Sequence, residues 1–156
     1  MAHTGGFGEP TCQICHMGMD VNEPGGSLTV TGLEETYEPG RVYRVTLTLD
    51  SEGTEAAGFQ ASVRYLAGTS TGRDAGRISS VDERTAFKRS ESGVTYVHQT
   101  KTAAKVASSR VSWMFDWEAP VDVGPVALHV AANSGNGDAS PFGDLIYTAS
   151  REMDPT

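Results

Sequence analysis

The sequence contains few cysteines and no long apolar segment. Its 156 residues include only two cysteines, which excludes a structural zinc site built from two cysteine pairs. No run of apolar residues is long enough to cross a bilayer. Residues 1–6 have neither the charged region nor the apolar region of a signal peptide, so we expect that a native targeting segment has been removed.

Positive charge is also scarce. Lys and Arg together number 12 against 20 Asp and Glu residues, which gives a formal net charge of −8. This balance argues against nucleic acid and anionic membrane surfaces as partners. An acidic protein can pair with a basic redox partner, but charge alone does not identify one.

Glycine is abundant, with 18 residues, and Thr and Val recur throughout the chain. This composition is typical of an all-β domain with many turns, and the length fits one domain with one core. Alternating apolar and polar residues predict strands at 27–31, 41–50, 59–66, 94–100, 111–117, 126–133 and 145–153, with a long loop at 134–144. Seven or eight short strands of this kind predict an immunoglobulin-like two-sheet sandwich.

The strand at 111–117 has the strongest core signal, because Val111, Trp113, Phe115 and Trp117 alternate along it. We assign residues 27–156 to the sandwich domain. Residues 1–26 form an N-terminal arm that is rich in Gly and Pro and has no sustained period. Such an arm is expected either to be ordered by a ligand or to remain a loose tail.

Both cysteines of the chain lie in the arm, in Cys12-Gln13-Ile14-Cys15-His16. This C-x-x-C-H pattern is the attachment motif of c-type haem. Two thiols add to the two vinyl groups of the porphyrin, and the adjacent imidazole reaches the iron from the proximal face. A single turn of chain supplies that geometry, so we predict one covalent haem c on Cys12 and Cys15 with His16 as an axial ligand.

Two other interpretations of the cysteine pair remain open. One is a disulfide between Cys12 and Cys15. The other is half of a metal site completed by His98 and His129, although these residues have no recognisable zinc spacing. A redox C-x-x-C would normally follow a strand of a βαβ unit, and the sequence predicts no such unit.

The second axial ligand of a haem would be His or Met, or water at an open site. His98 lies in the predicted strand 94–100, on the face that it shares with Val94 and Tyr96, and is our predicted ligand. His129 alternates with core residues and is expected to face outward, and His3 lies in a flexible start from which it could reach this iron or that of a neighbouring molecule. The methionines are weaker candidates still: Met17, Met19 and Met114.

Residues beyond the motif carry a family resemblance. They are TCQICH (11–16), GGSLTVTGL (25–33), YEPGRVY (37–43), GFQ (58–60), YVH (96–98), WMFDWEAP (113–120), GPV (124–126), AAN (131–133) and GDLIYT (143–148). Together they resemble the bacterial choice-of-anchor V domain, a relative of the Reeler domain of extracellular proteins, over nearly the whole chain. The resemblance implies an exported Reeler-like β-sandwich with an N-terminal C-x-x-C-H and a later strand histidine, which match His16 and His98.

The sequence therefore predicts an exported monohaem cytochrome, periplasmic, extracellular or on the cell surface, that carries single electrons and is not an enzyme. Its expected partner is a redox protein, and copies of the chain could extend the electron path. One alternative is an extracellular interaction or adhesion module with a Cys12–Cys15 disulfide, and another is a haem sensor or an enzyme acting on a small gas or peroxide. The loop 133–138, rich in Gly, Asn and Asp, is a minor candidate for Ca²⁺, although it lacks EF-hand spacing.

Overall fold

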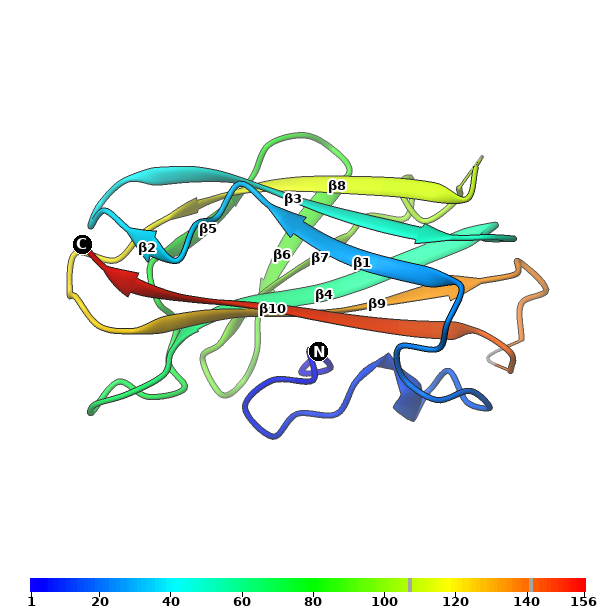
Figure 1. Cartoon of the computed structure of the whole chain (residues 1–156), viewed down its shortest axis with the longest axis horizontal. Coiled ribbons are helices and arrows are strands. Elements are labelled where there is room, and N and C mark those ends of the chain that lie inside the picture. Colours follow the sequence, from blue (N-terminus) through cyan, green and yellow to red (C-terminus); the bar gives the residue numbers. More distant parts are fainter. Residues whose placement is uncertain (107, 141) are drawn as a thin grey trace.

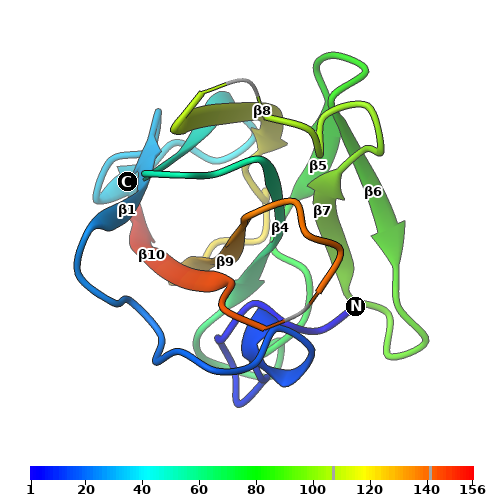
Figure 2. The ribbon, with the colours of Figure 1, turned by 90° about the vertical axis from the view of Figure 1, so that its right-hand side faces the viewer.

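Two β-sheets face each other in the computed structural model, which describes residues 1–106, 108–140 and 142–156 (Figures 1 and 2). Ten strands are present among these residues. The four-stranded sheet has the order β1 (Gly26–Thr31), β3 (Val42–Ser51), β8 (Arg110–Glu118) and β5 (Arg77–Ser80). Its pairings are all antiparallel.

The second sheet has six strands and carries the N-terminal arm. Its order is β2 (Thr36–Tyr37), β10 (Leu145–Pro155), β9 (Val126–Gly135), β4 (Ala56–Tyr65), β7 (Thr95–Gln99) and β6 (Thr85–Arg89). Only the short β2 pairs in parallel, with β10. The arm runs along the outer side of this sheet, beneath β10, β9 and β4 in Figure 1, and contains the 3₁₀ turn η1 (Cys12–Ile14).

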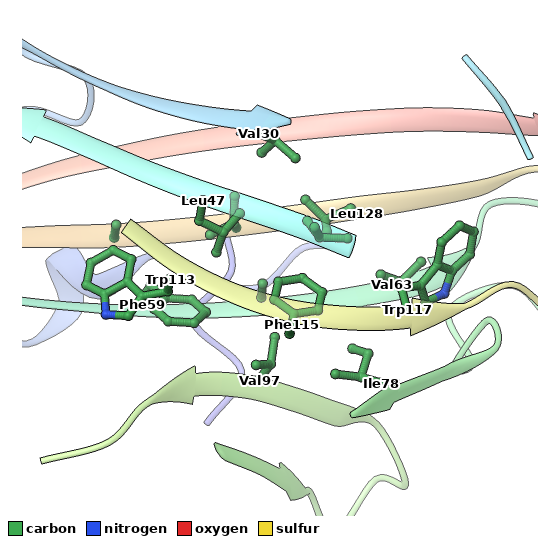
Figure 3. Close-up of a cluster of buried hydrophobic side chains, with 14 of the residues drawn as sticks. Val30, Leu47, Phe59, Val63, Ile78, Val97, Trp113, Phe115, Trp117 and Leu128 are labelled. Carbon is green, nitrogen blue, oxygen red and sulfur yellow. The ribbon is translucent and has the colours of Figure 1, made fainter. Parts of the chain in front are cut away.

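The core lies between the two sheets and follows the alternation of the strands (Figure 3). In β8 the side chains of Trp113, Phe115 and Trp117 are all buried, and the intervening residues point away from the core. The Trp113 ring lies against Phe59 of the opposite sheet, with 4.8 Å between the ring centroids. Aromatic contacts of this kind join the two sheets over a large apolar area.

The predicted all-β sandwich is confirmed, and all seven predicted strands are found with small shifts at their ends. Three short strands, β2, β5 and β6, were not predicted, because they contain at most five residues and too few alternating positions to give a period. The expected loop 134–144 begins later than predicted, since β9 continues to Gly135. Residue 141 of that loop lies outside the described residues.

Strand β9 is buried on both faces. Leu128 and Val130 point into the core, as predicted, but Ala127 and Ala131 on the other face are also fully buried. A strand of a two-layer sandwich normally exposes one face to solvent. The outer face of β9 is covered because the arm forms a partial third layer over the six-stranded sheet (Figure 2).

Truncation of a core aromatic side chain should destabilise the sandwich strongly. Phe115 is fully buried, so we expect Phe115→Ala to lower the free energy of unfolding by about 3–5 kcal/mol through lost burial and a cavity. The matched control is Phe87→Ala on β6, where the ring is 52% exposed, with an expected change within about 0.5 kcal/mol. Urea denaturation of both variants measures the difference, and equal losses would contradict the assignment of the core.

Candidate functional site

The N-terminal arm is held on the sheet by hydrogen bonds within the chain. The backbone N–H of Asn22 donates to the carbonyl oxygen of Ile146 on β10 at 2.7 Å. The Asn22 side chain both accepts from the N–H of Thr148 at 2.8 Å and donates to its hydroxyl at 2.9 Å. These contacts correct the expectation of a loose tail, because they join the arm to β10.

A buried arginine provides the second attachment. Arg64 projects from the outer face of β4 and is only 5% exposed. Its guanidinium forms an ion pair with Glu9 of the arm and donates a hydrogen bond to the Tyr96 hydroxyl on β7 at 2.8 Å. The Tyr96 hydroxyl in turn donates to Glu9. The Phe7 ring of the arm lies over the guanidinium, 4.9 Å from the ring centroid.

The hydrogen bonds of this network shift the pKa values of Glu9 and Tyr96. Burial raises the pKa of Glu9, but hydrogen bonds from Tyr96, Arg64 and Thr4 lower it by more, so the pKa lies below its ordinary value of 4.5. Burial, followed by the hydrogen bond to Glu9, raises the pKa of the Tyr96 hydroxyl. Glu9 is therefore the ionised partner of a buried arginine.

His129 packs beneath the same part of the arm. It faces outward from β9, as predicted, and its ring meets that of Phe7 edge-on at 5.3 Å. A Cβ at Gly6 would lie 2.3 Å from the His129 ring, so only glycine lets the arm approach so closely. Burial, then the charge of Arg64, lowers the pKa of His129. This histidine helps to seat the arm and does not line the cavity that contains the cysteine motif.

The cysteine motif forms one short turn in the middle of the arm. Thr11 caps it, since its hydroxyl accepts a hydrogen bond from the N–H of Gln13 at 3.2 Å. The N–H of His16 donates to the carbonyl oxygen of Cys12 at 3.0 Å, which closes the turn across the whole motif. The single turn that the spacing predicts is thus present.

Cys12 and Cys15 are free thiols, so the disulfide of the alternative interpretation is not formed. The two sulfurs lie in different surroundings, with Cys12 half-buried and Cys15 exposed. Burial raises the pKa of the Cys12 thiol to about 11. Cys12 is therefore protonated at neutral pH.

The motif borders a cavity of about 250 Å³ between the arm and the six-stranded sheet. Cys12, Cys15 and His16 line one side of the cavity, together with His3. The other side is formed by sheet residues Phe59, Gln60, Gln99 and Asn133. His3, which the sequence places in a flexible start within possible reach of the iron, lines the same cavity as the motif.

The ring of His16 is held by a carboxylate far away in the sequence. Its Nδ1 lies 2.5 Å from Oδ2 of Asp144, the residue that immediately precedes β10. Because a carboxylate only accepts hydrogen bonds, Nδ1 carries the proton and Nε2 keeps its lone pair in the neutral ring. Nothing in the local sequence connects these two residues, and Asp144 was not predicted to be part of the site.

His98 lies close to the motif but not in the same cavity lining. It is half-buried on the outer face of β7, directly opposite Gln60 of β4 in the ladder. Its Nδ1 lies 2.8 Å from the carbonyl oxygen of Gln99, so Nδ1 donates and Nε2 again remains free. The face predicted for His98 is confirmed, since Tyr96 projects on the same side toward the arm. Its role as a ligand stays a prediction.

Exposed apolar side chains gather around the motif. Large hydrophobic residues with 40% or more of their surface exposed include Met1, Ile14, Met17, Met19 and Phe142. Met1 and Ile14 line the cavity, and the carbonyl oxygen of Met17 accepts a hydrogen bond from Gly143, next to Phe142. This apolar rim has no cover within the described residues.

The remaining candidates make ordinary local contacts. Met114 projects from the outer face of β8, as expected, far in the fold from the motif. In the loop proposed for Ca²⁺, Asn136 and Asp138 hydrogen-bond to each other. Within residues 1–106, 108–140 and 142–156, no group of three or more His, Cys, Asp or Glu side chains is arranged to hold a bare metal ion. In the same ranges, no helix is long and apolar enough to cross a membrane.

Comparison with solved structures defines the class of fold. The Reelin-N domain of F-spondin shares 19% sequence identity over 93% of this chain and 95% of its own, with a TM-score of 0.59. The human F-spondin reeler domain (fragment 1) shares 21% identity over 86% of this chain and 93% of its own, with a TM-score of 0.55. A cohesin module from a Clostridium perfringens family 33 glycoside hydrolase shares 15% identity over 84% and 96%, with a TM-score of 0.56.

The chain thus has a Reeler-like sandwich, and at these identities the likeness concerns the fold alone. No protein-family model matches the sequence, and no curated protein matches it. The Reeler part of the sequence resemblance is confirmed at the level of the fold. The narrower resemblance to the choice-of-anchor V domain stays a prediction.

The lowered pKa of Glu9 makes the arm sensitive to acid. The stabilisation from ionised Glu9 is complete above pH 4.5, its ordinary pKa, and is lost as the pH falls through the lower value in the folded chain. We therefore expect the protection factors of the arm amides, taken relative to their intrinsic exchange rates at each pH, to fall below about pH 4.5 while those of the core strands stay high. Glu9→Gln should weaken protection of the arm at neutral pH and flatten its pH dependence.

The matched control for this prediction is Asp20→Asn, which removes an exposed carboxylate from the same arm and should leave the profile unchanged. An arm that stays equally protected at pH 3 and pH 7, or that responds equally to both substitutions, would disprove the role of Glu9.

Proposed function

We propose that this chain is an exported β-sandwich domain that binds one haem c covalently through Cys12 and Cys15, with His16 as an axial ligand. When bound, the haem supplies one-electron exchange between Fe(III) and Fe(II). The protein then acts as an electron carrier rather than an enzyme, and takes its electron from another redox protein. The sandwich supplies a rigid face on which the arm presents the site.

One observation carries this proposal: two free thiols and one imidazole lie in a single turn, and Nδ1 of that imidazole is already hydrogen-bonded. A metal-binding histidine typically donates its other ring N–H to a carboxylate or carbonyl, which leaves the opposite nitrogen for the metal. His16 has this arrangement through Asp144. The donor set therefore fits a haem attached by C-x-x-C-H.

The surroundings of the motif also fit a haem. The apolar rim offers uncovered side chains to a large aromatic macrocycle, for example at Ile14 and Met17. Gln60 lines the cavity, and its buried Oε1 has no hydrogen-bond partner among the described residues. His98 would be the second protein ligand of the iron, because its Nδ1 is hydrogen-bonded to a carbonyl oxygen and its Nε2 is left to bind the metal.

A second candidate function is an extracellular interaction module without haem. The Reeler and cohesin structures favour this candidate, since such modules are typically extracellular and none of those compared is named as a cytochrome. The two candidates share the fold and the exported location. They differ in whether the two thiols bind haem.

The chain should acquire a covalent haem when it is exported from cells that also express the haem-maturation machinery. We expect a sharp α-band on reduction with dithionite, and absorbance that stays with the polypeptide after denaturation and acid extraction, because thioether bonds survive both. The control is the double variant Cys12→Ser and Cys15→Ser, which keeps His16 but removes both attachment points. A wild-type chain without covalent haem under these conditions would favour the interaction module.

Replacement of the second ligand should change the spin state of the iron. We expect His98→Ala to convert a six-coordinate low-spin spectrum to a high-spin one, since removal of a strong-field axial ligand leaves water or an open position. The comparison variant, His129→Ala, removes a histidine that packs beneath the arm from the same sheet face; it can weaken the seating of the arm but should leave the spectrum low-spin. An unchanged spectrum in His98→Ala would exclude His98, and His3 would then be the next residue to replace.

A further inference from the structure

Asp144 is a buried carboxylate with an unusual set of partners. It is 4% exposed, and Oδ2 forms the 2.5 Å contact with Nδ1 of His16. Its other oxygen, Oδ1, has no hydrogen-bond partner among the described residues. The backbone of Gly135 passes beside this oxygen, and a Cβ there would lie 3.3 Å from it.

A buried carboxylate of this kind is costly unless its charge is compensated. Removing a charged group from water carries a large free-energy cost, and an unpaired buried oxygen adds to that cost. His16 is the only ion-pair partner of Asp144 among the described residues. The Nδ1–H of a neutral His16 compensates part of this charge, and a positive centre bound at Nε2 would compensate more of it.

We propose that Asp144 is a positioning residue that fixes the tautomer of His16 and holds the reduction potential of the attached haem low. This proposal rests on the proposed haem attachment. A carboxylate that accepts the Nδ1–H makes the imidazole a stronger electron donor at Nε2. Fe(III) carries one more positive charge than Fe(II), so a nearby buried negative charge stabilises the oxidised state and disfavours the gain of an electron.

The two histidines proposed as haem ligands differ in the group that accepts the hydrogen bond from Nδ1. Nδ1 of His98 donates to the neutral carbonyl oxygen of Gln99, whereas Nδ1 of His16 donates to a charged carboxylate. The charged acceptor forms the stronger hydrogen bond. We therefore expect the hydrogen bond between His16 and Asp144 to affect the reduction potential more than the hydrogen bond between His98 and Gln99 does.

The test compares the midpoint potentials of the haem-loaded wild type and Asp144→Asn. Asparagine keeps the shape and an accepting oxygen but removes the charge. In the titration, dithionite gives one electron to Fe(III) and ferricyanide removes it again. We expect the variant to favour Fe(II) at least tenfold more than the wild type, which is a rise of 59 mV for a one-electron couple.

Two further variants separate charge from structure. Asp138→Asn removes an exposed carboxylate from the same loop and should leave the potential near that of the wild type. Asp144→Glu keeps the charge and should restore a low potential. Equal potentials in the wild type and Asp144→Asn, or a Glu variant that matches the Asn variant, would overturn the proposal.

The haem-free chain gives an independent measurement. At mildly alkaline pH, nitrogen NMR of the His16 ring should place the proton on Nδ1 in the wild type, and Asp144→Asn should shift it partly to Nε2. A proton on Nε2 in the wild type would overturn the role of Asp144 even if no haem were attached. Absence of covalent haem together with an Nδ1 proton would instead count against the proposed function alone.

Discussion

The buried guanidinium of Arg64 on the outer face of β4 is the constraint on which the rest of the site depends. A sheet face that contains such a charge must be covered by a partner of opposite charge, and Glu9 of the arm is that partner. Removing one member of a buried ion pair costs about 3–5 kcal/mol, because the other charge is left unpaired. The hydroxyl of Tyr96 and the ring of Phe7 complete the enclosure. The arm therefore docks in one position.

That docking determines the chemistry available at the motif. With the arm fixed at Glu9 and again at Asn22, the turn between these residues is held against the end of the sheet. There Asp144, from the loop before β10, reaches the ring of His16. A motif that needs only a short turn for its own geometry thus acquires a fixed tautomer and a buried charge from a distant part of the chain. Reeler and cohesin structures share the sandwich, and this likeness concerns the fold alone.

Much of the sandwich was accessible from the sequence. Strands such as β8 bury every second residue over nine positions, and that period is visible without any knowledge of the fold. The strands that were not predicted, such as β5, are short, and partners distant in the sequence define them. For the candidate site, the sequence identified Cys12, Cys15, His16 and the outward face of His98. It gave no sign of Glu9, Arg64 or Asp144, since a single charged residue has no periodicity and its partner is known only from the fold.

By itself the amino-acid sequence determined an all-β chain, the location of its core and a C-x-x-C-H turn, because these depend on residues that are neighbours along the chain. Only the tertiary structure decided that the arm is bound and not loose, that His129 seats it, and that His16 donates its Nδ1 proton to Asp144. The physical reason is that the free energy of a charged side chain depends mainly on whether it is buried, and segments distant in the sequence determine that burial. Whether Asp144 is a solvated loop residue or a buried carboxylate against an imidazole depends on which segments the fold brings together.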